Sequence, residues 1–425
     1  MNSIYSFIEF IHSIKLKVFF ILVLFSFKSF SQEKDLRFYM EKAQTNSPLL
    51  KDLSNQIKSN SIDSLLNKAN YKPQILGNLN ANYAPIINGY GYDSAITNGQ
   101  SVAGLVGLNQ KIIGKGIINS QAESFQLLKE SLVLNKRIAS KDVNKLITAQ
   151  YITASGSAEQ IGYNQKMAAL LKDEATILKK LTQNSIYKQT DYLVFLTTIK
   201  QQEFQVLQLK QQYQNDLGML NYLSGETDTT FVNLKKPDIA LKTIQTDTKS
   251  VFVKQFEVDS LKIINQNKLI DNAYKPSLSL LGDAGYFSSL SYQASKNLGF
   301  SVGLGLSIPI YDGNQKSLQH QKNETALATN LAYKANFNKQ YQQQLLMLHQ
   351  KLKQAIEIEN QLQTQLQIVD ALIEANKKLL LTGDAQITDF VIAIGNVITI
   401  NNTISQNKIN TLQLINEINY WSSND

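Results

Sequence analysis

The segment from Leu298 to Asn314 has the sequence Leu-Gly-Phe-Ser-Val-Gly-Leu-Gly-Leu-Ser-Ile-Pro-Ile-Tyr-Asp-Gly-Asn, and its pattern gives the first indication of the fold. Apolar residues alternate strictly with glycine or serine from Leu298 to Ile308. A period of two predicts one long β-strand with an apolar face and a face of small residues. Pro309 then ends the strand, and Asp312-Gly313-Asn314 predicts a turn.

The residues after this turn have the opposite character. Residues 314–382 contain neither glycine nor proline and are rich in helix-forming residues. They predict a single helix about 100 Å long, at 1.5 Å per residue. A long strand that leads into such a helix is not the plan of a compact globular domain, in which helices average about 11 residues.

The same plan occurs twice in the chain. Three pairs of segments match at one offset of 198 residues, namely Lys111–Gly116 with Pro309–Asn314, Thr190–Leu193 with Thr388–Val391, and Asn221-Tyr222 with Asn419-Tyr420. Upstream, Tyr71-Lys72-Pro73 matches Tyr274-Lys275-Pro276 at an offset of 203, so the first copy has a longer loop between its strands. We infer a tandem duplication, each copy having a helix, a strand, a loop, a strand and a helical hairpin.

The N-terminus has the pattern of a secretory signal peptide over residues 1–31. Lys15 and Lys17 precede an apolar core, Val18–Phe27, and Ser29 and Ser31 are the small residues of a cleavage site. A membrane anchor is the alternative, but the core is short for a span of roughly 20 residues and Lys28 follows it directly. Export is therefore predicted.

Composition and breakers divide the mature chain into three parts. Residues 32–225 form the first repeat, with a helix start at Ser47-Pro48, and residues 251–425 form the second. Residues 226–250, which include Pro237, form an irregular connection. The first hairpin is predicted from the proline-free residues 117–217 and ends at Asn221–Gly225, and Gly156 and Gly162 are the candidate weak points of its helices. Helical reversals are predicted at Asn184-Ser185 and at Thr382-Gly383.

Residues that carry enzyme chemistry are sparse. The chain has no cysteine, which excludes disulfides and thiolate metal sites, and His320 and His349 lie 29 residues apart on one predicted helix. The sequence contains no phosphate-binding loop and no nucleophile elbow. The net charge is +8, but no basic run interleaved with aromatic residues indicates nucleic-acid binding. We predict no enzyme, no cofactor and no metal site.

The four predicted strands have the length that crosses a bilayer, about 9–11 tilted residues. One face of each is apolar, which is the pattern of a membrane barrel. Four strands cannot close a barrel, so the strands alone leave two readings open, a soluble β-sandwich or a barrel pooled from several chains. In the second reading, the predicted lipid-facing side chains are Leu278, Leu280, Val302, Leu304 and Leu306.

Taken together, these features resemble the TolC family of outer-membrane efflux and secretion channels. The resemblance is carried by Tyr274-Lys275-Pro276, Pro309–Gly313, Gly383 followed by Thr388–Val391, and Leu220–Gly225. The first copy departs from the family pattern at Lys111–Gly114, at Ser185, where glycine is usual, and at Ser47-Pro48, where Asn-Pro is usual.

This resemblance implies a mainly α protein with a membrane β-barrel portion. Three chains would pool four strands each into a twelve-stranded barrel in the cell outer membrane and would form an α-helical tunnel in the periplasm. The channel would be a passive exit duct for tripartite efflux or type I secretion. Its partners would be a periplasmic adaptor (membrane fusion) protein and an inner-membrane pump of the RND, ABC or MFS type. The alternative is a periplasmic coiled-coil adaptor or scaffold without a pore, which would not need four strands of bilayer length.

The resemblance also points to two candidate sites. The predicted hairpin tips, at Asn184, Ser185, Thr382 and Gly383, would contact the adaptor. Asp191 and Asp389 occupy matching places after the two tips, and the family has constriction aspartates at this motif. Each aspartate either caps its helix or contributes to an acidic ring at the narrow end of the tunnel. Ile392 stands where a second aspartate can occur, so the ring would be single.

Overall fold

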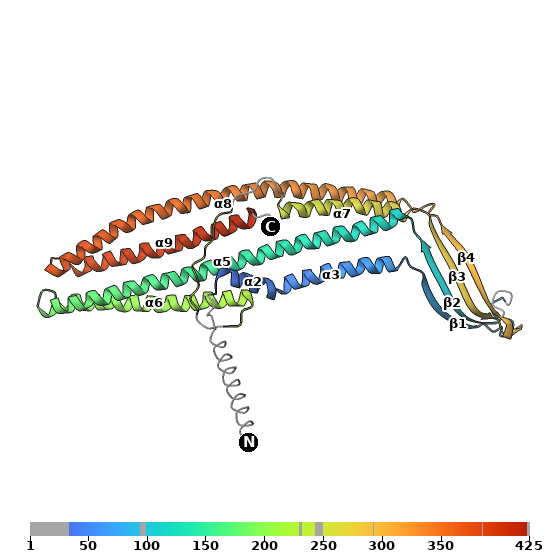
Figure 1. The fold of residues 1–425 in the computed structure, drawn as a ribbon, viewed down its shortest axis with the longest axis horizontal. Helices are drawn as coiled ribbons and strands as arrows, with labels where there is room; N and C mark the ends of the chain where they lie inside the picture. The colour runs from blue at the N-terminus through green and yellow to red at the C-terminus, as the bar shows by residue number, and fades with distance from the viewer. Residues whose placement is uncertain are drawn as a thin grey trace, which may run out of the picture. The chain divides into compact units, whose positions relative to one another are not determined.

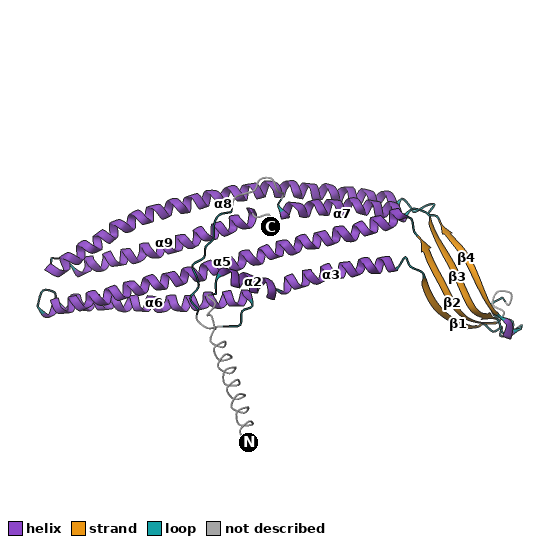
Figure 2. Ribbon diagram, viewed as in Figure 1, coloured by secondary structure: helices purple, strands orange, loops and turns teal. Residues whose placement is uncertain are grey.

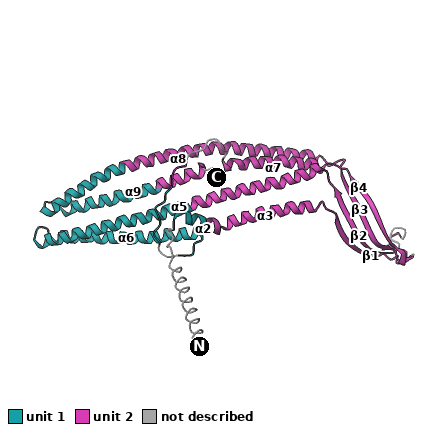
Figure 3. Ribbon diagram, in the orientation of Figure 1, with its two compact units in different colours: residues 1–42, 147–238, 361–409 teal, residues 43–146, 239–360, 410–425 magenta. Residues whose placement is uncertain are grey.

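The computed structural model describes residues 34–93, 99–228, 232–242, 250–291, 293–384 and 386–422. The predicted signal peptide and part of the predicted connection lie outside these residues. The chain forms two compact units (Figure 3). Unit 1 comprises residues 1–42, 147–238 and 361–409, and unit 2 comprises residues 43–146, 239–360 and 410–425. Each unit therefore contains parts of both repeats.

Long helices and four strands make up the described chain (Figures 1 and 2). In chain order they are α2 (Leu36–Asn46), α3 (Pro48–Ala69), β1 (Gln74–Tyr83), β2 (Gln100–Ile112), α5 (Lys115–Gln183), α6 (Gln189–Ser224), α7 (Val251–Ala273), β3 (Ser277–Ser288), the short 3-10 helix η1 (Ala294–Lys296), β4 (Leu298–Ser307), α8 (Gln315–Thr382) and α9 (Ile387–Ser422). Each copy thus has the predicted order, and the uninterrupted 68-residue α8 confirms the long helix.

The first hairpin ends where the sequence predicts, because Gly225 is the residue that ends α6, in a left-handed conformation with φ 70°. Helix α5 continues through both Gly156 and Gly162. A Cβ at Gly156 would lie 2.2 Å from Cδ1 of Ile409, so glycine here lets α9 approach α5 closely.

The sheet of unit 2 has the strand order β1-β2-β3-β4, and every pair is antiparallel. Since paired residues share a face, the register assigns every strand position to one of two faces. The apolar face holds, strand by strand, Ile75, Gly77, Leu79, Ala81, Tyr83, then Gln100, Val102, Gly104, Val106, Leu108, Gln110, Ile112, then Leu278, Leu280, Gly282, Ala284, Tyr286, Ser288, and Leu298, Phe300, Val302, Leu304, Leu306. Its few polar members lie at or near strand ends.

The opposite face of the sheet is mixed: most of its residues are polar or small, and Leu76, Leu105, Leu281 and Phe287 also lie on it. Both charged residues of the four strands, Lys111 and Asp283, lie on it, and Ser301 donates a hydrogen bond of 2.6 Å to the Asp283 carboxylate. Asparagines from β1 and glycines and serines from β4 occupy much of the rest. Strands β1 and β4 form the two edges, and each pairs with one neighbour only.

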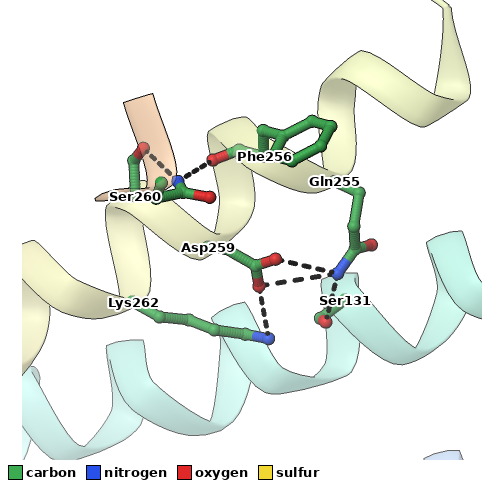
Figure 4. A network of polar contacts seen from close by, with 7 residues as sticks. Ser131, Gln255, Phe256, Asp259, Ser260 and Lys262 are labelled. Carbon is green, nitrogen blue, oxygen red and sulfur yellow. Dashed lines mark hydrogen bonds and ion pairs between the residues drawn. The ribbon is translucent and has the colours of Figure 1, made fainter. Parts of the chain in front are cut away.

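Hydrogen bonds between buried and partly buried polar side chains join the helices of unit 2 to one another (Figure 4). The Gln255 amide of α7 donates to Oγ of Ser131 on α5 at 3.0 Å. From α8, the Asn330 amide donates to the Phe256 carbonyl and to Oγ of Ser260, both at 2.8 Å. Such bonds fix the register between helices whose apolar seams alone would allow sliding.

The main hydrophobic core of unit 1 lies between its two hairpins. Leu171 and Leu178 of α5, Phe195 of α6, Leu380 of α8 and Phe390 of α9 are almost fully buried in it. The Phe195 and Phe390 rings stack with their centroids 6.1 Å apart. This core holds the ends of both hairpins together.

Candidate functional site: the hairpin tips and the apolar sheet face

The first hairpin tip is a tight turn between α5 and α6. Ser185 has a φ of 62°, in the left-handed region. Its N–H donates to the Thr182 carbonyl at 3.0 Å, and the Ile186 N–H donates to the Leu181 carbonyl at 3.0 Å. This pair of bonds is a Schellman motif, which normally takes glycine at the left-handed position.

The second tip repeats this turn at the offset of 198 residues. Gly383 has a φ of 83°. Its N–H donates to the Leu380 carbonyl at 3.4 Å, and the Asp384 N–H donates to the Leu379 carbonyl at 3.0 Å. The two tips therefore share one backbone geometry, and Ser185 replaces glycine without changing the turn.

Both tips contact each other. The Tyr187 hydroxyl donates to the Leu380 carbonyl at 3.1 Å, which links the first tip to the end of α8. A Cβ added to Gly383 would lie 2.8 Å from Cγ2 of Ile186. Of the four predicted tip residues, Ser185 and Gly383 thus set the turns, and Asn184 and Thr382 flank them as exposed residues.

The two candidate constriction aspartates occupy matching positions in the first turns of α6 and α9. The Asp191 carboxylate accepts a hydrogen bond of 3.2 Å from the N–H of Lys188, so this side chain caps the start of α6. Asp389 is exposed, and Ile392, one turn further along α9, is 60% exposed. Both aspartates belong to unit 1.

An ion pair that the sequence analysis missed lies near the tips. Glu174 of α5 is 2% exposed, and its Oε1 lies 2.9 Å from Nζ of Lys377 on α8. Its Oε2 has no hydrogen-bond partner in the described part of the chain. The carboxylate raises the pKa of Lys377. No local pattern marks this pair, because its members lie in different repeats.

The apolar sheet face is the second candidate surface. All five predicted lipid-facing residues lie on it, and within this chain they are exposed or partly exposed, as in Leu304, which is 71% exposed. Exposed apolar surface of this extent marks an interaction site, with protein or with membrane. As for metals, the described residues include no group of three or more His, Asp or Glu side chains that could bind one.

Comparisons with known proteins found similar proteins by structure and none by sequence. No model of a protein family matches the sequence. A search of curated proteins found no match either.

Solved structures match over almost the whole chain. CusC is 10% identical, with a TM-score of 0.75 over 92% of this chain and 93% of its own. The outer membrane protein VceC of Vibrio cholerae is 11% identical, with a TM-score of 0.73 over 91% of this chain and 96% of its own. The CmeC outer membrane channel of Campylobacter jejuni is 14% identical, with a TM-score of 0.71 over 91% and 85%. The chain therefore has the fold that the sequence resemblance implied.

Proposed function

We propose that this protein is the outer-membrane channel of a tripartite efflux or type I secretion system, a passive exit duct across the outer membrane. The observation that carries this proposal is the distribution of residues on the sheet. Both charged residues of the strands lie on one face, and the other face is apolar and exposed. A soluble sandwich would cover that face, whereas lipid covers it in a membrane barrel.

Assembly as a homotrimer follows from the open edges of the sheet. Unpaired strand edges are not tolerated in the hydrocarbon of a bilayer. Strands β1 and β4, the two edges, each have 10 residues and so match in length. Pairing of β4 in one chain with β1 in the next would close a twelve-stranded barrel from three chains, with the polar face inside. The structural neighbours, which are described as an outer membrane channel and an outer membrane protein, support a location of this sheet in the outer membrane.

The hairpin tips are the proposed contact surface for a periplasmic adaptor protein, which would connect the channel to an inner-membrane pump of the RND, ABC or MFS type. Asn184, Ser185, Thr382 and Gly383 form the two turns. Apolar side chains are exposed beside them, including Ile186 and Leu193. These apolar side chains are exposed to solvent in the single chain, and binding of a partner would bury them.

The constriction is proposed at the same end, with three copies of Asp389 as its main acidic groups. One oxygen of Asp191 already accepts a backbone hydrogen bond, whereas the Asp389 side chain is exposed. Carboxylates brought together in a ring repel one another and attract cations.

Conductance across a planar lipid bilayer tests the proposal. Purified protein is expected to form stable, passive channels that need no energy source. The rival reading, an adaptor or scaffold without a pore, predicts no channels and a protein that stays in the water-soluble fraction. That result would overturn the proposal.

A further inference from the structure

Three lysines lie at the end of the sheet where the strands join the helices. The Tyr-Lys-Pro segment of each repeat directly precedes a strand, so that Lys72 precedes β1 and Lys275 precedes β3. Lys115 follows β2 at the start of α5. The register pairs the start of β1 with the end of β2, and the end of β2 with the start of β3. All three lysines are exposed, and they lie at the end of the sheet where the strands join the helices. This end of the strands is named the helical edge and is distinct from the edge strands β1 and β4.

These three charges are not neutralised by the protein. No carboxylate in the described part of the chain forms an ion pair with Lys72 or Lys115, and the Nζ of Lys275 lies 2.7 Å from Oδ1 of Asn272, a neutral amide. Other lysines of unit 2, such as Lys268 and Lys334, are paired with glutamates at 2.8 and 3.0 Å.

A polar pocket adjoins Lys275. It has a volume of about 360 Å³ and lies where the start of α5 meets the end of α7. Its two carboxylates are already paired, Glu123 with Lys268 at 2.8 Å and Asp271 with Lys316 at 3.0 Å. The cation in this pocket that lacks a carboxylate partner is Lys275, and the pocket has room for a phosphate group beside it.

Apolar side chains extend from the same edge. Ile310 and Tyr311, which follow β4, are 94% and 90% exposed. Aromatic residues at the end of a bilayer-length strand lie at headgroup depth, where the stems of lysines also extend along apolar surface.

The opposite end of the sheet, where loops connect β1 to β2 and β3 to β4, differs in charge. Among the described residues of the two loops there, residues 84–93, 99, 289–291 and 293–297, one is acidic, Asp93, and one is basic, Lys296. These residues therefore carry no net charge.

We propose that Lys72, Lys115 and Lys275 bind the phosphate groups of anionic phospholipids in the membrane leaflet on the helical side. This inference rests on the proposed membrane function. A phospholipid fits better than free phosphate, because the apolar sheet face begins at the helical edge and Ile310 lies there too. Both would contact the acyl chains of the lipid. In each trimer, nine lysine side chains would form a ring around the barrel.

The test measures which lipids stay bound to the protein. The detergent-solubilised assembly is exchanged into an equal mixture of phosphatidylglycerol and phosphatidylcholine, and the retained lipids are counted by native mass spectrometry. We expect enrichment of phosphatidylglycerol on the unaltered protein. Each Lys→Gln change should lower the relative affinity about fivefold, since a basic residue near an anionic surface contributes about 1 kcal/mol. The triple variant K72Q/K115Q/K275Q should show no enrichment.

A matched control is available at the same edge. Lys111 lies on the polar face, opposite Ser279, so Lys111→Gln should leave the enrichment unchanged. Enrichment that survives the triple variant, or that falls equally in Lys111→Gln, would overturn the lipid site. Conductance in pure phosphatidylcholine separates the two proposals. Channels that conduct there but show no preference for phosphatidylglycerol would contradict the lipid site alone, whereas absence of channels in both lipids would contradict both.

Discussion

At the scale of single residues, the two tip turns form a natural comparison, because Ser185 and Gly383 hold the same left-handed conformation. A side chain in this region costs roughly 1–2 kcal/mol relative to glycine, partly offset by the greater entropy of glycine in the unfolded chain. Ser185→Gly should therefore stabilise the protein by about 0.5–1 kcal/mol and raise its melting temperature. Gly383→Ser should lower it, because the new Cβ would lie 2.8 Å from Ile186. A lower melting temperature for Ser185→Gly would refute this account of the turn.

The aspartates give a second prediction at this scale. Asp389→Asn removes a charge at almost constant shape, so the channel should lose its preference for cations and its block by multivalent cations, while assembly is unchanged. Asp191→Asn should have a smaller effect on selectivity, because the Asp191 side chain is engaged with the N–H of Lys188. Ion selectivity and block in planar bilayers measure both. If neither variant changes them, the constriction lies elsewhere.

At the scale of elements, the Glu174–Lys377 pair joins α5 to α8 between the two hairpins. Lys377→Met would leave the buried carboxylate of Glu174 without its cation. This change should destabilise the protein by about 1–3 kcal/mol. The cost is smaller than for a fully buried ion pair, because Lys377 is partly exposed. The double variant E174Q/K377M should recover most of that loss, as it leaves no buried charge. Thermal unfolding of the three proteins measures the coupling. A double variant as unstable as the single one would show that the pair is not the cause.

The sheet face yields a prediction about strands. Leu304 lies on the apolar face and Gly303 on the opposite one. Leu304→Arg near the bilayer midplane should cost about 2–4 kcal/mol per chain and reduce the amount of protein assembled in the outer membrane. Gly303→Ser is the control, since a Cβ there would meet no atom within 4 Å. Equal yields of the two variants would show that the faces are wrongly assigned.

Elements with a local signal could be predicted from the sequence, and contacts between distant segments could not. The alternation from Leu298 onward and the absence of glycine and proline in residues 314–382 are local, and β4 and α8 follow from them. The sequence offered capping as one of two roles for Asp191, and the bond to the N–H of Lys188 confirms that this side chain caps α6. The pair of Glu174 with Lys377 depends on how two hairpins pack together. This pair has no signature within one stretch of sequence.

A single chain is not a complete molecule, because its sheet is open at both sides. A four-stranded sheet with two open edges and an exposed apolar face is incomplete in water and in lipid. Closure by three chains would satisfy the edges, cover the apolar face with lipid and place Lys111 and Asp283 in an aqueous lumen. The aspartate ring depends on this closure, because it takes one Asp389 from each of three copies, and closure would arrange the lysine sites of the three copies in a ring around the barrel.

The most direct test of this central claim is the mass of the protein extracted from outer membranes in mild detergent. Native mass spectrometry, which resolves the protein from bound detergent, should give a complex of three chains. Extraction without detergent should recover almost none of the protein. A stable monomer that remains soluble in water without detergent would contradict the account.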